Sequence, residues 1–222
     1  MSIVVRTLSE QAYELVRARI LIGDIPAGMP LRQDAIAMEL GVSKIPLREA
    51  LSRLEQDGLL SSYPNRGFVV RPLSSREAEE VFALRLKIEP DATAAASLAA
   101  TPQDRALAEL ALSALEQMQN KGETLDHVAL NRAFHMALVR PGSGLITCQV
   151  IERLNILAER YVHVHLEPEG RNDRAKDEHR ALLKFWTEGD ADKVATATAE
   201  HIRGTMSDLR KQLRSNIDPA SA

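Results

Sequence analysis

The sequence predicts a mainly α-helical protein with one short β-hairpin in its first third. Aromatic residues make up only 4% of the chain, while hydrophobic residues reach 45%. Sheets need aromatic and β-branched residues, whereas the frequent Ala and Leu of this chain favour helices. Strand-like sequence is found only before residue 72. We therefore expect a small domain of helices and a hairpin, residues 1–73, followed by an all-helical domain, residues 74–222.

The composition narrows the classes of function. No run approaches the roughly 18–20 apolar residues that span a bilayer, and we expect no signal peptide at the N-terminus. Cys148 is the single cysteine, so an intramolecular disulfide is excluded. A cytoplasmic protein is the simplest interpretation. The net charge is −3, and residues 1–73 hold nine Lys/Arg against eight Asp/Glu, so any case for nucleic-acid binding depends on where the basic residues lie.

The first two helices have clear ends. Ser9 is expected to cap a helix that ends at Gly23, and its apolar positions recur every three to four residues. A loop rich in Gly and Pro follows, and then a short helix over residues 33–40. Gly41 is expected to end that helix in the left-handed conformation.

The third helix carries the strongest indication of function. Ser43 is a good N-cap, and Pro46 falls in the first turn, where its missing N–H costs nothing. An apolar stripe along this helix faces the core, while Lys44 and Arg48 share the opposite face near the N-terminus. Two helices joined by a Gly-Val-Ser turn, with a basic outer face on the second, are typical of a helix-turn-helix that enters the major groove.

A hairpin is predicted directly after this helix. Residues 59–63 and 68–71 are strand candidates, and Pro-Asn-Arg-Gly at residues 64–67 is a turn. Such a hairpin is a wing beside the helix-turn-helix. Arg66 at its tip is expected to reach phosphate or the minor groove.

The segment from Arg32 to Leu60 resembles the winged helix of the GntR superfamily, with Pro-Leu-Arg-Glu-Ala-Leu at residues 46–51 as its most specific part. The resemblance implies DNA contacts from six residues: Arg32, Ser43, Lys44, Arg48, Arg66 and Gly67. The family's usual Arg-Thr is Lys44-Ile45 here. Lysine cannot form the bidentate contact that arginine makes with guanine, and isoleucine has no hydroxyl for a phosphate. We therefore expect an operator preference that differs from the family's usual one.

The rest of the chain predicts a bundle of six helices with its own core. A capping box at residues 74–77 marks its start. Pro90 is expected to break the first of these helices. The expected spans are residues 75–100, 102–120, 125–140, 145–167, 172–188 and 190–214.

Several polar residues lie on stripes that should be buried. These are Arg85, the pair Asn131 and His135 one turn apart, His179 and His201. Each inward histidine alone is more often a hydrogen-bonded core residue, but buried polar groups cost free energy unless they have partners. A divalent transition ion, with zinc first, would partner the histidines and the amide oxygen together. The periodicity alone leaves a metal site and a set of satisfied core residues equally open.

Four segments of this half resemble the FCD domain, the effector domain of the FadR-type GntR branch. They are residues 82–90, residues 131–135, residues 178–179 and His201. The resemblance implies a metal held by an Asp and three His, completed by a carboxylate effector. Here the usual Asp is Asn131, an oxygen ligand without charge. Arg85 is expected to meet the anionic effector, because an inward guanidinium requires an anion.

These features predict a homodimeric transcriptional regulator, a repressor by the commoner logic of the family, that binds a palindromic operator and is controlled by a small carboxylate. Two alternatives stay open. One is a helical metal-dependent hydrolase fused to a DNA-binding module, for which a clear general base is missing. The other is a nucleoid-type DNA binder without a ligand, which would have no use for the buried histidines.

Overall fold

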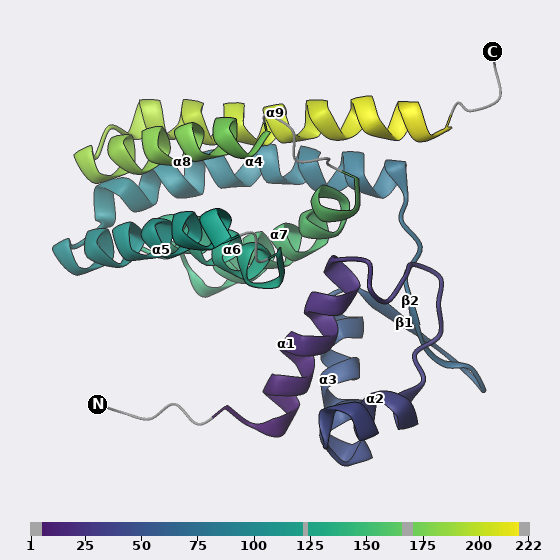
Figure 1. Cartoon of the computed structure of the whole chain (residues 1–222). Coiled ribbons are helices and arrows are strands. Elements are labelled where there is room, and N and C mark those ends of the chain that lie inside the picture. The colour runs from purple at the N-terminus through teal and green to yellow at the C-terminus, as the bar shows by residue number, and fades with distance from the viewer. Residues whose placement is uncertain (1–5, 122–123, 166–170, 218–222) are drawn as a thin grey trace. The chain divides into compact units, whose positions relative to one another are not determined.

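The computed structural model describes residues 6–121, 124–165 and 171–217, and it divides the chain into an N-terminal unit, residues 1–74, and a C-terminal unit, residues 75–222 (Figure 1). The mainly α class is confirmed, because the described residues form helices and one two-stranded sheet. No helix within the described ranges is long and apolar enough to cross a bilayer.

The N-terminal unit is a winged helix-turn-helix, as predicted. Helices α1 and α3 pack against each other, and α3 also contacts α2 and β1. The strands pair antiparallel, from Leu60 opposite Val70 to Tyr63 opposite Gly67, and a bridge from Pro30 to Val69 adds the preceding loop to the hairpin. The elements are α1 (Leu8–Leu21), α2 (Gln33–Leu40), α3 (Lys44–Gln56), β1 (Leu60–Tyr63) and β2 (Gly67–Val70).

The start of α1 differs from the expected cap. The N-cap is Thr7, and Ser9 lies in the first turn. The Thr7 hydroxyl accepts a hydrogen bond from the Glu10 N–H at 3.1 Å, and the Glu10 carboxylate accepts one from the Thr7 N–H at 2.8 Å. This reciprocal pair satisfies two backbone N–H donors. A cap at Ser9 could not form it, because the residue three positions later is not a glutamate.

The turn between α2 and α3 follows the prediction. Gly41 ends α2 with φ of 64°, in the left-handed region where glycine meets no steric cost. Ser43 is the N-cap of α3. The apolar stripe of α3 is fully buried, which fixes the opposite face toward solvent. Its members are Leu47, Ala50, Leu51 and Leu54.

The C-terminal unit contains six helices within its described residues. Helix α4 packs along α9 and also contacts α6, α7 and α8, so it is the central helix of the bundle (Figure 1). Phe134, Leu182 and Trp186 lie in the main core, and the Trp186 indole donates to the Leu138 carbonyl at 3.0 Å. The helices are α4 (Ser75–Ala99), α5 (Pro102–Lys121), α6 (Thr124–Val139), α7 (Leu145–His165), α8 (Arg171–Glu188) and α9 (Ala191–Ile217).

The predicted break at Pro90 is wrong, because α4 continues through this residue. A proline within a helix removes one backbone hydrogen bond and costs about 3 kcal/mol. Pro90 is buried, and α4 is held by helices on several sides, chiefly α9 and α7. Tertiary packing therefore offsets the local preference.

Candidate metal centre and DNA-binding surface

The N-terminus of α3 presents a polar, exposed surface. Ser43, Lys44 and Arg48 are all exposed, and the Ser43 side chain forms no capping hydrogen bond with its own helix. The Ser43 hydroxyl is therefore available to a phosphate or base. Ile45 lies among these polar groups with 73% of its surface exposed.

The other predicted DNA contacts lie around the same end of the unit. Asp34 in the first turn of α2 forms an ion pair with Lys44 at 2.6 Å, so the N-termini of α2 and α3 are adjacent. Gly67 lies against Gln33, because a Cβ at Gly67 would be 3.2 Å from the Gln33 amide nitrogen. The hairpin tip therefore approaches the start of α2. Arg32 precedes Gln33 in sequence and Arg66 precedes Gly67, and both arginines are exposed.

The three predicted histidines come together in the C-terminal unit. His135 lies on α6, His179 on α8 and His201 on α9. Their ring centroids are 4.9 to 5.1 Å apart, and one nitrogen from each ring lies within 4.8 Å of the others. Small side-chain rotations would therefore place three imidazole nitrogens around one ion.

The histidine cluster lies in an apolar environment. His135 and His179 are buried, His201 is largely so, and the Phe134 ring packs 5.1 Å from the His179 ring. Burial, followed by the charges of His179, His201 and Arg85, holds the pKa of His135 well below its ordinary value of 6.5. His135 is therefore neutral near pH 7, as a metal ligand must be.

The chemistry of this cluster fits a divalent transition ion. His135 Nε2 and the Thr198 hydroxyl are buried and have no hydrogen-bond partner among the described residues. A buried polar atom without a partner costs about 1–3 kcal/mol, and a metal bound to the imidazole would remove the cost at His135. Three imidazoles from three helices are a donor set that zinc accepts.

Asn131, the predicted fourth ligand, is half-buried on α6, one turn before His135. That position is compatible with chelation by residues i and i+4 of one helix. Coordination by Asn131 stays a prediction.

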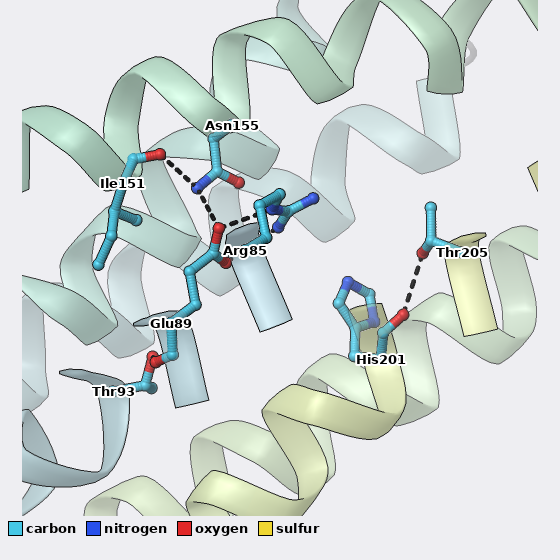
Figure 2. A network of polar contacts seen from close by, with 7 residues as sticks. All are labelled: Arg85, Glu89, Thr93, Ile151, Asn155, His201 and Thr205. Atoms are coloured by element: carbon cyan, nitrogen blue, oxygen red, sulfur yellow. Dashed lines mark hydrogen bonds and ion pairs between the residues drawn. The ribbon is translucent and has the colours of Figure 1, made fainter. Parts of the chain in front are cut away.

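Arg85 is buried on α4, but it already has an anionic partner. Its guanidinium donates to both oxygens of Glu89, at 2.6 and 3.0 Å, and Asn155 of α7 donates to the same carboxylate at 3.2 Å (Figure 2). The premise that an inward Arg85 requires an outside anion is therefore wrong, because Glu89 one turn later supplies the charge. Arg85 remains near the cluster, since its charge contributes to the lowered pKa of His135.

The sequence did not predict that Glu178 takes part in this site. Its Oε2 lies 2.7 Å from His201 Nδ1, across from α8 to α9. Glu178 is next to His179 in sequence, and neighbours in a helix diverge by about 100°. That same divergence directs its carboxylate to another histidine of the cluster. No periodic pattern indicates such a contact between helices.

The winged helix-turn-helix defines a DNA-binding regulator with a second, helical domain, and comparison with known proteins confirms the class. The model of the bacterial regulatory proteins of the gntR family matches residues 8–70, and the FCD domain model matches residues 80–204. The chain therefore belongs to the GntR family of HTH-type transcriptional regulators, in the branch that carries an FCD domain. This is a family of regulators, so the alternative of a hydrolase is not supported.

Individual relatives agree with this assignment. The HTH-type transcriptional regulator McbR of Escherichia coli K12 is 33% identical over 148 residues, 67% of each chain. The HTH-type transcriptional repressor RspR of the same strain is 22% identical over 211 residues, 95% of this chain and 92% of RspR. A solved structure of E. coli McbR/YncC has a TM-score of 0.81 at 27% identity, and the match covers 94% of this chain and all of that one.

Proposed function

We propose that residues 1–73 bind operator DNA and that residues 74–222 dimerise and bind a small carboxylate beside a divalent metal, with zinc first. Effector binding changes the operator affinity. The observation that carries this proposal is the convergence of His135, His179 and His201 from three helices.

Operator contacts are assigned to the six residues around the N-termini of α2 and α3 and the hairpin tip. Arg48 reads bases, Lys44 and Arg32 contact phosphates, Ser43 contacts the backbone, and Arg66 with Gly67 follows the adjacent groove. Exposed Ile45 gives this chain an apolar group at the start of the recognition helix. Apolar side chains contact the thymine methyl group in the major groove.

The operator assignment is tested by selection of binding sites from random DNA. Ile45→Thr should change the preferred base at one position of each half-site, where the wild type is expected to prefer thymine. Replacing this thymine by uracil should weaken DNA binding by the wild type but not by the variant. Met38→Ala is the control, because Met38 is an exposed apolar residue on α2. Identical preferences for the wild type and Ile45→Thr would contradict base reading by Ile45.

The effector site is assigned to the histidine cluster and Arg85. A zinc ion held by Asn131 and the three histidines would accept a carboxylate oxygen by expanding to five ligands. Arg85 binds the effector carboxylate, which competes with the Glu89 carboxylate for the Arg85 guanidinium. Because Glu89 also bonds Asn155 of α7, this exchange reaches α7 directly. Operator affinity responds because the effector binds two arrangements of the protein with different affinity.

Dimerisation is assigned to the C-terminal unit. Leu84 of α4 and Ile146 and Val150 of α7 are exposed apolar residues on two helices that pack together. A second copy would cover them, and two recognition helices would then read half-sites about one helical turn apart. Light scattering should give twice the mass of 24.5 kDa, and Ile146→Asp should lower it. A monomeric wild type would contradict this assignment.

Repression is the proposed direction of control, since the similar protein RspR is named a repressor. The test combines a thermal-shift screen of small carboxylates, with and without zinc, and operator binding with each hit. We expect carboxylates that stabilise only the zinc-loaded protein and that weaken operator binding. Zinc-independent hits would contradict the metal site, and unchanged operator affinity would contradict effector control.

A further inference from the structure

Two consecutive residues of α8 face His201 of α9. The His179 ring centroid lies 4.9 Å from that of His201, while Glu178 Oε2 lies 2.7 Å from His201 Nδ1. A carboxylate only accepts hydrogen bonds, so the shared proton belongs to Nδ1. The ring then offers Nε2, and only Nε2, as a lone pair for a ligand.

The Glu178 carboxylate is itself held in place. Its second oxygen, Oε1, lies 3.2 Å from the Arg174 guanidinium, one turn earlier on α8. Arg174 also forms an ion pair with Asp208, about two turns beyond His201 on α9. Both ends of the network are therefore anchored on the two helices that it joins, and the carboxylate has little freedom to leave His201.

We propose that Glu178 is a positioning residue: it fixes His201 as the Nδ1-protonated tautomer with Nε2 directed at the metal. A carboxylate hydrogen-bonded to the far nitrogen of a metal-binding histidine orients the ring and raises its basicity. The effect matters more here because the four predicted ligands, Asn131 and the three histidines, are all neutral. Through His201, Glu178 places a negative charge next to an otherwise neutral donor set.

Two measurements test this inference, and only the second of them depends on the proposed metal site. The first readout is the tautomer of His201 in metal-free protein, from long-range ¹H–¹⁵N correlation spectra. We expect Nδ1–H in the wild type, retention of Nδ1–H in Glu178→Gln, whose amide oxygen still accepts, and its loss in Glu178→Ala. Glu200→Gln is the matched control, because Glu200 is exposed and next to His201 in sequence.

The second readout is the zinc dissociation constant of the full chain, measured by competition with a chromophoric chelator. Loss of a partner to a metal-binding histidine costs about 10- to 100-fold in affinity, which we expect for Glu178→Ala, with a smaller loss for Glu178→Gln and none for Glu200→Gln. An unchanged tautomer in Glu178→Ala overturns the proposal, as does a changed tautomer with unchanged zinc affinity. A wild type that binds no zinc overturns the metal site itself, and the tautomer then still decides whether Glu178 orients His201.

Discussion

The two functional regions of this chain differ in how their residues depend on one another. The DNA-binding surface consists mostly of exposed residues on elements close in sequence, and Lys44 forms an ion pair there with the neighbouring Asp34. The histidine cluster instead joins side chains from α6, α8 and α9, most of them buried. Exposed residues on a fixed scaffold can be replaced one at a time, whereas a buried cluster loses its function when any member is changed.

The largest effect is expected where a buried charge loses its partner. Glu89→Ala leaves Arg85 buried beside the histidine cluster without its carboxylate, and it should lower the free energy of unfolding by about 3–5 kcal/mol, measured by urea denaturation. The double variant Arg85→Met with Glu89→Leu should recover most of this loss, because two apolar side chains leave no uncompensated charge. A double variant as unstable as Glu89→Ala would contradict this explanation.

The next effect tests whether the histidines act as a unit. At a zinc concentration about 100 times the dissociation constant, binding should stabilise the protein by about 2.7 kcal/mol. His135→Ala, His179→Ala and His201→Ala should each remove this gain, and a triple variant should remove no more. Thermal unfolding with and without zinc measures it. Partial gains that add up across the three variants would show that the residues act separately.

A smaller effect is expected on the DNA-binding surface. Arg48→Ala should weaken binding to a selected operator by about 5- to 150-fold, with little change in stability, because the Arg48 side chain is exposed. Lys44→Ala should weaken binding to all sequences alike and reduce the salt dependence by about one counterion. Fluorescence anisotropy at several salt concentrations separates the two. Equal losses on specific and random DNA for Arg48→Ala would reassign that residue to the phosphates.

The smallest effect concerns Asp34. Asp34→Ala removes the anion that pairs with Lys44 in the free protein, so it should strengthen DNA binding by less than about five-fold at low salt. The gain should vanish in the Lys44→Ala background. A gain that persists there would mean that Asp34 acts through general repulsion of phosphates.

Local signals predicted the N-terminal unit nearly residue by residue. Gly41, Ser43 and the turn at residues 64–67 each determine the conformation of their own neighbourhood, and the structure has all three where the sequence placed them. The failures are also local. The cap of α1 is formed by Thr7 and Glu10 and not by Ser9, and packing around α4 overrides the helix-breaking tendency of Pro90.

The histidine cluster was predictable only as far as helix faces allow. The periodicity of the sequence predicted that His135, His179 and His201 face inward, but it does not predict the distances between helices. The Glu89 partner of Arg85 was readable as an i, i+4 pair. The Glu178 contact was not, because it depends on how α8 and α9 are rotated against each other.

That rotation has a consequence of its own. Glu178 and His179 leave α8 about 100° apart, yet both face the one ring of His201, so the ring lies in the angle between them. Turning α8 about its axis brings one of them closer to His201 and carries the other away. The two contacts therefore exist together at only one rotation angle of α8 about its axis. The contacts of Glu178 and His179 with His201 thus fix the rotation of α8 against α9 as well as the separation of the two helices.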